Sequence, residues 1–114
     1  MYIGNLDPVS NRADWRITRE VVDDDTDERV DLTGAEIRFE VRDQRNFSTL
    51  LRASTTDGRI TIDDIGTFTV AFSASDMRNL APGIYDVGCI IIMNGITDQF
   101  ILGTVTVLDG VVRQ

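Results

Sequence analysis

The chain has 114 residues, a formal net charge of −8 and a single cysteine. This length suits one domain, and the 42% of its residues that are apolar can form an ordinary hydrophobic core. An acidic domain repels phosphate groups, which argues against nucleic acid or an anionic membrane as a partner. One cysteine excludes an internal disulfide and a cysteine-based zinc site.

Neither end of the chain predicts a membrane or export segment. No apolar run approaches the roughly 18 residues that span a bilayer. Residues 1–10 lack the basic and apolar regions of a signal peptide. We therefore expect a protein that is made in a cytoplasm and has no membrane partner.

The apolar residues recur with a period of two, which predicts strands that bury one face. A weak first strand covers residues 15–21. Residues 35–42 follow, where apolar residues alternate with a Glu-Arg-Glu-Arg row that should lie in water. Further alternating strands cover residues 67–73 and 85–93. The pattern predicts an all-β fold, an antiparallel β-sandwich of about seven to eight strands.

Turn signals separate these strands. Asp57-Gly58 and Asn94-Gly95 are typical of two-residue hairpins. The first hairpin would place Arg52 opposite Asp63. Residues 75–80 predict one helical turn that Ser75 caps and Pro82-Gly83 ends.

The Asn94-Gly95 hairpin also predicts which side chains share a face. If its two strands pair without irregularity, Ile90, Ile92 and Ile101 form an apolar patch on the solvent side. Such a patch is either a contact surface for another protein or is covered by residues 1–6 of the same chain. We expect residues 1–13 to form an extended N-terminal arm and residues 14–114 to form the sandwich. The predicted interface residues are Met1, Tyr2, Ile3, Leu6, Ile90, Ile92 and Ile101.

The sequence offers no set of residues for catalysis. Histidine, the commonest general base, is absent, and Cys89 lies in an apolar strand with no base beside it. We therefore expect no enzymatic activity and no cofactor. Asp23, Asp25 and Asp27 lie in an acidic turn that could hold a hard cation such as calcium, or could be a solvated turn.

Several segments resemble a known family. VDLTGAEIRF at residues 30–39 resembles the opening of a small immunoglobulin-like module of tailed-bacteriophage tail, baseplate and fibre proteins. DGRI at residues 57–60, LAPGIY at residues 80–85 and Leu102-Gly103 fall where that family has similar elements, so the resemblance covers residues 14–108. LAPGIY also resembles the tyrosine corner of immunoglobulin folds, in which the phenol bonds to upstream backbone.

This resemblance implies an immunoglobulin-like sandwich that is a structural protein of the virion. Its partners would be copies of itself and other virion structural proteins, in a homo-oligomer within the particle. The first hypothesis is that the chain is a tail, baseplate or adaptor subunit. The alternatives are a capsid decoration or head-fibre protein and a carbohydrate-binding or adhesin module.

Overall fold

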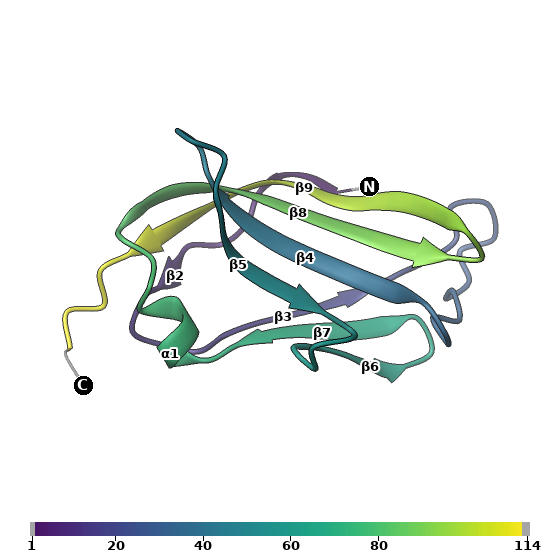
Figure 1. Ribbon diagram of the computed structural model, residues 1–114. Helices are drawn as coiled ribbons and strands as arrows, with labels where there is room; N and C mark the ends of the chain where they lie inside the picture. Colours follow the sequence, from purple (N-terminus) through teal and green to yellow (C-terminus); the bar gives the residue numbers. More distant parts are fainter. Residues whose placement is uncertain (1, 113–114) are drawn as a thin grey trace.

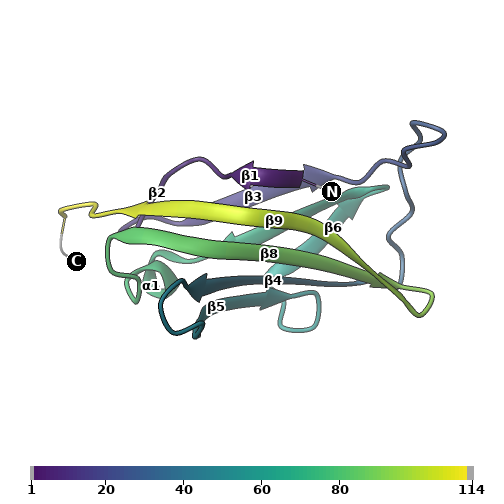
Figure 2. The same cartoon turned by 90° about the horizontal axis from the view of Figure 1, so that it is seen from above.

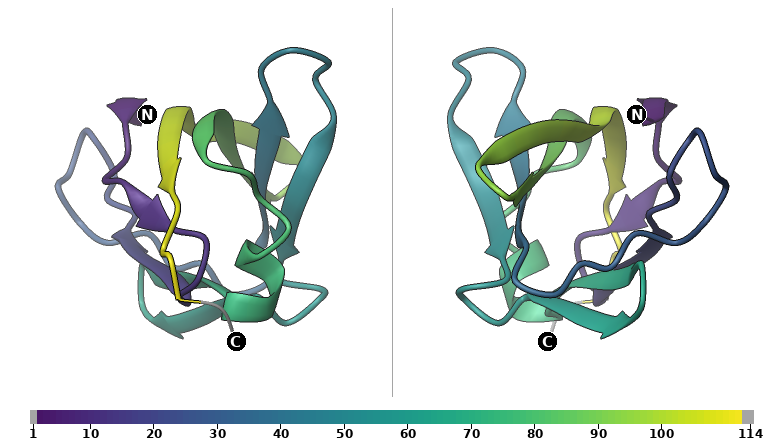
Figure 3. Two further views of the ribbon diagram at one scale, coloured as in Figure 1. Left: turned by 90° about the vertical axis from the view of Figure 1, so that its left-hand side faces the viewer. Right: turned by 90° about the vertical axis from the view of Figure 1, so that its right-hand side faces the viewer.

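Two β-sheets pack face to face in the computed structural model, which describes residues 2–112 (Figure 1). The larger sheet contains, in spatial order, β1 (Tyr2–Asn5), β9 (Ile96–Leu108), β8 (Gly83–Met93), β4 (Glu36–Asp43) and β5 (Thr49–Ser54), with the short β2 (Val9–Ser10) also paired to β9. The smaller sheet contains β3 (Trp15–Glu20), β7 (Thr67–Phe72) and β6 (Ile60–Asp64). Seen along the strands, the sheets form two layers (Figure 3). The predicted all-β immunoglobulin-like sandwich is confirmed.

The core lies between the layers and follows the predicted alternation. In β4 the apolar residues are buried while the intervening charged residues point away from the core. The indole of Trp15 on β3 packs edge-on against Phe39, with ring centroids 5.6 Å apart, and lies 5.7 Å from the ring of Phe72. This cluster of three buried aromatic side chains packs β3 of the smaller sheet against β4 of the larger sheet.

The predicted tyrosine corner is present at the start of β8. The Tyr85 hydroxyl donates a hydrogen bond of 2.5 Å to the Ala81 carbonyl. Just before it, α1 (Ala74–Met77) is a single helical turn, capped by Ser73 instead of the predicted Ser75. Ser73 and Asp76 form a capping box, which satisfies backbone N–H groups at the start of the turn. Within residues 2–112, no helix has the length and hydrophobicity that crossing a membrane requires.

The Asp57-Gly58 segment does not form the predicted hairpin. It links β5 in the larger sheet to β6 in the smaller sheet, so Arg52 does not pair with Asp63. The Asp57 carboxylate accepts hydrogen bonds from the backbone N–H groups of Ser54 and Arg59, which shapes a longer turn between the layers. Asp63 instead accepts hydrogen bonds from two threonine hydroxyls of its own sheet.

The N-terminal segment is extended, as predicted, but it belongs to the larger sheet. β1 and β2 run parallel to β9 along one edge, beside the hairpin and not over its outer side (Figure 2). Leu6 is buried in the core. The buried Asn11 side chain donates to the Leu80 carbonyl and accepts from the Gly110 N–H, which fixes the end of this segment. Residues 2–10 are therefore edge strands of the sandwich and not a free arm.

A β-bulge changes the predicted faces of the β8–β9 hairpin. Ile90 pairs with Gln99, but Cys89 pairs with Ile101, so Phe100 is the extra residue. Phe100 packs against the Phe68 ring at 5.7 Å, and Ile101 also turns toward the core. Beyond the bulge each side chain lies on the opposite face from the one predicted, because side chains alternate along a strand. The placement of Ile101 in the solvent-side patch is wrong: Ile101 is 1% exposed and Leu102 is 50% exposed.

This register makes opposite predictions for two adjacent residues. Ile101→Asp should destabilise the protein by about 4 kcal/mol, because it buries an unpaired charge. Leu102→Asp should change the free energy of unfolding by less than about 1 kcal/mol, because its side chain is in solvent. Urea denaturation followed by tryptophan fluorescence measures both. A stable Ile101→Asp protein together with an unfolded Leu102→Asp protein would contradict the bulge.

Candidate functional site

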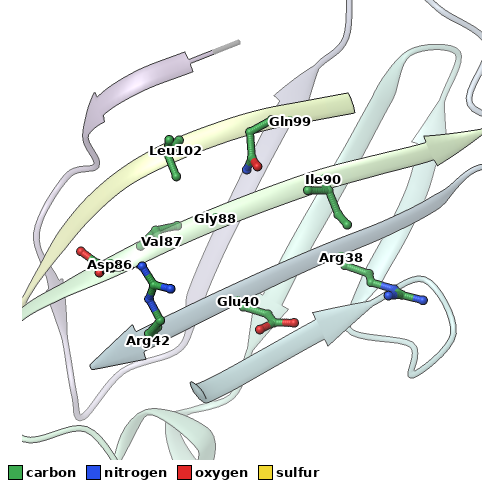
Figure 4. Close-up of a pocket in the computed structure, with 9 residues that line it drawn as sticks. All are labelled: Arg38, Glu40, Arg42, Asp86, Val87, Gly88, Ile90, Gln99 and Leu102. Atoms are coloured by element: carbon green, nitrogen blue, oxygen red, sulfur yellow. Dashed lines mark hydrogen bonds and ion pairs between the residues drawn. The ribbon is translucent and has the colours of Figure 1, made fainter. Parts of the chain in front are cut away.

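The outward side chains of β4, β8 and β9 form a surface that we call the outer face. It contains a shallow hollow of about 270 Å³ (Figure 4). Gly88 forms the floor, since it lies between Glu40 on β4 and Leu102 on β9 and has no side chain. A Cβ placed there would have only the Gln99 amide nitrogen within 4 Å, at 3.8 Å. The hollow is lined by Arg38, Glu40, Arg42, Asp86, Val87, Gly88, Ile90, Gln99 and Leu102.

Charged groups line the β4 side of the hollow. Arg42 forms an ion pair of 3.2 Å with Asp86, which also accepts a hydrogen bond from the Gln44 amide. Arg38 pairs with Glu36 at 3.0 Å. All four charged side chains of these pairs are partly exposed, so each pair contributes well under about 1 kcal/mol to stability. Their effect is to hold two guanidinium groups at defined positions on the outer face.

Apolar side chains line the opposite side. Ile90 is half-buried beside the hollow, and Leu102 is exposed across from it. The Gln99 amide donates to the carbonyls of Cys89 and Ile101, which satisfies backbone groups that the bulge leaves unpaired. The apolar row extends in both directions along the two strands, through Ile84, Ile92 and Leu108. Asp86 on β8 and two threonines on β9, Thr104 and Thr106, interrupt this row, so its exposed apolar side chains lie in separate groups beside charged and polar ones. Exposed apolar side chains that gather on one face are typical of a surface that binds a partner.

The structure places the predicted interface residues in three environments. Ile90 and Ile92 lie on the outer face, whereas Leu6 is in the core, as is Ile101. Tyr2 and Ile3 are exposed on β1 at the sheet edge, and Met1 lies outside the described residues. The sequence prediction missed Gly88 and Leu102. A glycine within an apolar strand was the available signal for the hollow.

The acidic turn is a self-contained loop. The Asp23 carboxylate accepts hydrogen bonds from the backbone N–H groups of Asp25 and Thr26, and a bridge between Val22 and Arg29 closes the loop. Across residues 2–112, no cluster of three or more histidine, cysteine or acidic residues is arranged to hold a metal ion. Asp23, Asp25 and Asp27 are therefore not assembled into a calcium site.

Calcium titration checks this arrangement. We expect no saturable heat when calcium is added to the purified protein in an isothermal titration calorimeter, because Asp23 is already bonded to its own backbone. An Asp25→Asn/Asp27→Asn variant should give the same trace. Saturable heat that disappears in this variant would contradict the prediction.

Cys89 is fully buried in the middle of β8. Burial raises the pKa of its thiol to about 12, because the thiolate is poorly solvated in the core. The thiolate is the reactive form of cysteine, so this side chain acts as a packing group and not as a nucleophile.

A thiol reagent tests this conclusion. Native protein should not react with 5,5′-dithiobis(2-nitrobenzoic acid) at pH 8, and unfolding in guanidinium chloride should release one reactive thiol per chain. The Leu102→Cys variant is a matched control whose added thiol should react at once, since residue 102 is half exposed. Rapid reaction of the native wild-type protein would show that the strand opens.

Comparisons with known proteins establish the fold only. No protein family and no curated protein sequence matches the chain. Among solved structures, the chain is similar to part of the endo-beta-1,4-mannanase from Thermotoga petrophila, with a TM-score of 0.56 and 11% sequence identity. The match covers 91% of this chain and 18% of the mannanase. At this identity the likeness shows a shared sandwich fold and carries no activity with it.

Proposed function

We propose that this chain is a non-catalytic assembly module that binds other proteins through its outer face, as a structural subunit of a tailed-bacteriophage particle. The observation that carries the proposal is the apolar row along β8 and β9. Ile84, Leu102 and Leu108 are each at least half exposed there. Covering that row with another protein would remove apolar surface from water, which stabilises an association by about 25 cal/mol per Å² before other costs.

The virion assignment is supported by a resemblance and by one structural detail. The segments that resemble the phage module include residues 80–85, and the Tyr85–Ala81 hydrogen bond shows that this segment builds a tyrosine corner. The sandwich has no disulfide and would be stable in the reducing cytoplasm where a phage assembles. We propose the same role for this chain whether it is a tail, baseplate, adaptor or decoration subunit of the particle.

A carbohydrate-binding role is the second candidate, because one of the similar structures is part of a mannanase. The hollow offers polar side chains beside apolar ones, as a sugar site does. Exposed aromatic rings for stacking on sugars are sparse, however. Trp15 is buried, and Phe47 lies outside the hollow with its ring under the Arg42 guanidinium, 5.0 Å away. These observations favour a protein partner.

Particle composition tests the proposal. We expect peptides of this chain in phage particles that are produced from the genome carrying its gene and purified on a density gradient. The ratio of this chain to the major capsid protein should stay constant across the particle band in quantitative mass spectrometry. A soluble host protein of similar abundance serves as the control and should not enter the band. Absence of this chain from the particles, or specific binding of the purified protein to β-mannan, would contradict the proposal.

A further inference from the structure

We propose that the outer face binds a second copy of this chain about a twofold axis that passes over Phe39 of β4 and Cys89 of β8. The proposal deepens the proposed function and rests on it, since it names the partner of the same surface. A twofold axis that lies in the interface, perpendicular to the strands, places each strand opposite its own copy in the antiparallel direction. Residues at equal distances on either side of the axis then face one another.

The charged side chains on β4 are arranged as this twofold rotation requires. Its outward residues are Glu36, Arg38, Glu40 and Arg42. About an axis at Phe39, Arg38 of one copy faces Glu40 of the other, and Glu36 faces Arg42. Every charge in the row therefore meets a charge of opposite sign, and each pair occurs twice because of the symmetry.

The shape of β8 fits the same axis. Phe39 is in register with Cys89, so the axis that passes over one also passes over the other. Gly88 and Ile90 lie on either side of Cys89, which places the Ile90 side chain of each copy over the Gly88 hollow of the other. The projecting Ile90 side chain therefore meets the Gly88 hollow next to the axis, beside the pair of opposite charges that Arg38 and Glu40 form.

The bulge brings β9 into the same arrangement. Cys89 pairs with Ile101, and the outward neighbours Gln99 and Leu102 lie on either side. Leu102 of one copy would approach Gln99 and Ile90 of the other. In a regular pairing, with Phe100 opposite Cys89, Ile101 would point outward and Leu102 would point into the core.

The outer face together with the adjoining strand β5 is electrically balanced, unlike the whole chain. The outer face has three central acidic residues, Glu36, Glu40 and Asp86, and two basic ones, Arg38 and Arg42, and Arg52 on β5 supplies a third basic side chain beside Glu40. The chain as a whole has a net charge of −8. Two copies can therefore approach through this face without the like-charge repulsion that the net charge creates elsewhere.

The crossing angle of two stacked sheets limits how many of these residue pairs can make contact. Stacked sheets cross at about 30°, which displaces partners one residue from the axis by about 2 Å and partners three residues from it by about 5 Å. Arg38–Glu40 and Ile90–Gly88 are thus the pairs that tolerate the crossing best. Four strands over seven residues project about 450 Å², below the roughly 800 Å² per partner of a standard interface. We therefore expect a dimer that dissociates on dilution.

Sedimentation equilibrium of the full chain tests the proposal through a charge exchange. Arg38→Glu and Glu40→Arg should each raise the dimer dissociation constant at least about tenfold, because each creates two like-charge contacts across the axis. The double variant, Arg38→Glu with Glu40→Arg, should restore most of the affinity. Arg16→Glu on β3 of the other sheet is the matched control and should leave the dissociation constant unchanged. Circular dichroism melting confirms that each variant is folded.

A second pair of variants tests the fit of projection and hollow. Gly88→Val fills the hollow, and its Cβ would come no closer than 3.8 Å to the Gln99 amide nitrogen of its own chain. Ile90→Asp removes the projection, so both variants should give monomers. Ile65→Asp, an exposed isoleucine in the turn between β6 and β7, is the control and should still dimerise. Folded single charge variants that dimerise like the wild-type protein, or a double variant that stays monomeric, would overturn the proposed axis.

Two further outcomes separate this proposal from the proposed function. A wild-type chain that stays monomeric at millimolar concentration and low salt, but enters phage particles unless Ile90→Asp is present, overturns the dimer and leaves the assembly role intact. A wild-type dimer that the charge exchange breaks and restores, in a chain absent from particles, supports the dimer and overturns the virion assignment.

Discussion

The one-residue slip in the pairing of β8 with β9 determines the character of the outer face. Because side chains alternate along a strand, an extra residue at Phe100 reverses the facing of everything beyond it in β9. Phe100 stays packed against the core, Ile101 joins it, and Leu102 moves to the solvent side. Bulges also increase local twist, and the Gln99 amide satisfies the carbonyls that this one exposes. The same local irregularity thus fills the core and places an apolar side chain beside the hollow at Gly88.

The edges of the larger sheet depend on a different constraint, the close approach of two backbones. A Cβ on Gly103 would collide with the Gly4 carbonyl, so β1 can pair with β9 only because residue 103 is glycine. Asn11 then bonds to the backbone at Leu80 and Gly110, which are distant in sequence. β1 and β2 thus cover the backbone of β9, and β1 and β5 become the two edge strands of the larger sheet.

How far the sequence predicts this structure depends on whether the signal is local. Alternation in residues 35–42 and the Asn94-Gly95 turn predict β4 and the β8–β9 hairpin, because both depend on neighbouring residues. The bulge leaves no such signal: Phe100, Ile101 and Leu102 are all apolar, so the unbulged and bulged registers each bury an apolar side chain. Parallel pairing of β1 with β9 joins residues about a hundred positions apart, and alternation within a short strand does not report its partner. The glycine at residue 88 was visible in the sequence, but its meaning as a hollow required the neighbours on β4 and β9.

The charge pattern limits which partners this outer face can accept. Long-range repulsion from the net charge is screened beyond about 8 Å at physiological salt, so the short-range pattern decides whether a surface can bind. An alternating row such as that of β4 rejects a uniformly charged partner, because half of its charges would meet like charges. An unrelated protein would need its own row with matching spacing, whereas a copy in the antiparallel orientation has one by symmetry. The Gly88 hollow and the Ile90 side chain obey the same symmetry, so charge and shape favour the same orientation of the second copy. This agreement distinguishes the outer face from the solvent-exposed face of an ordinary sheet.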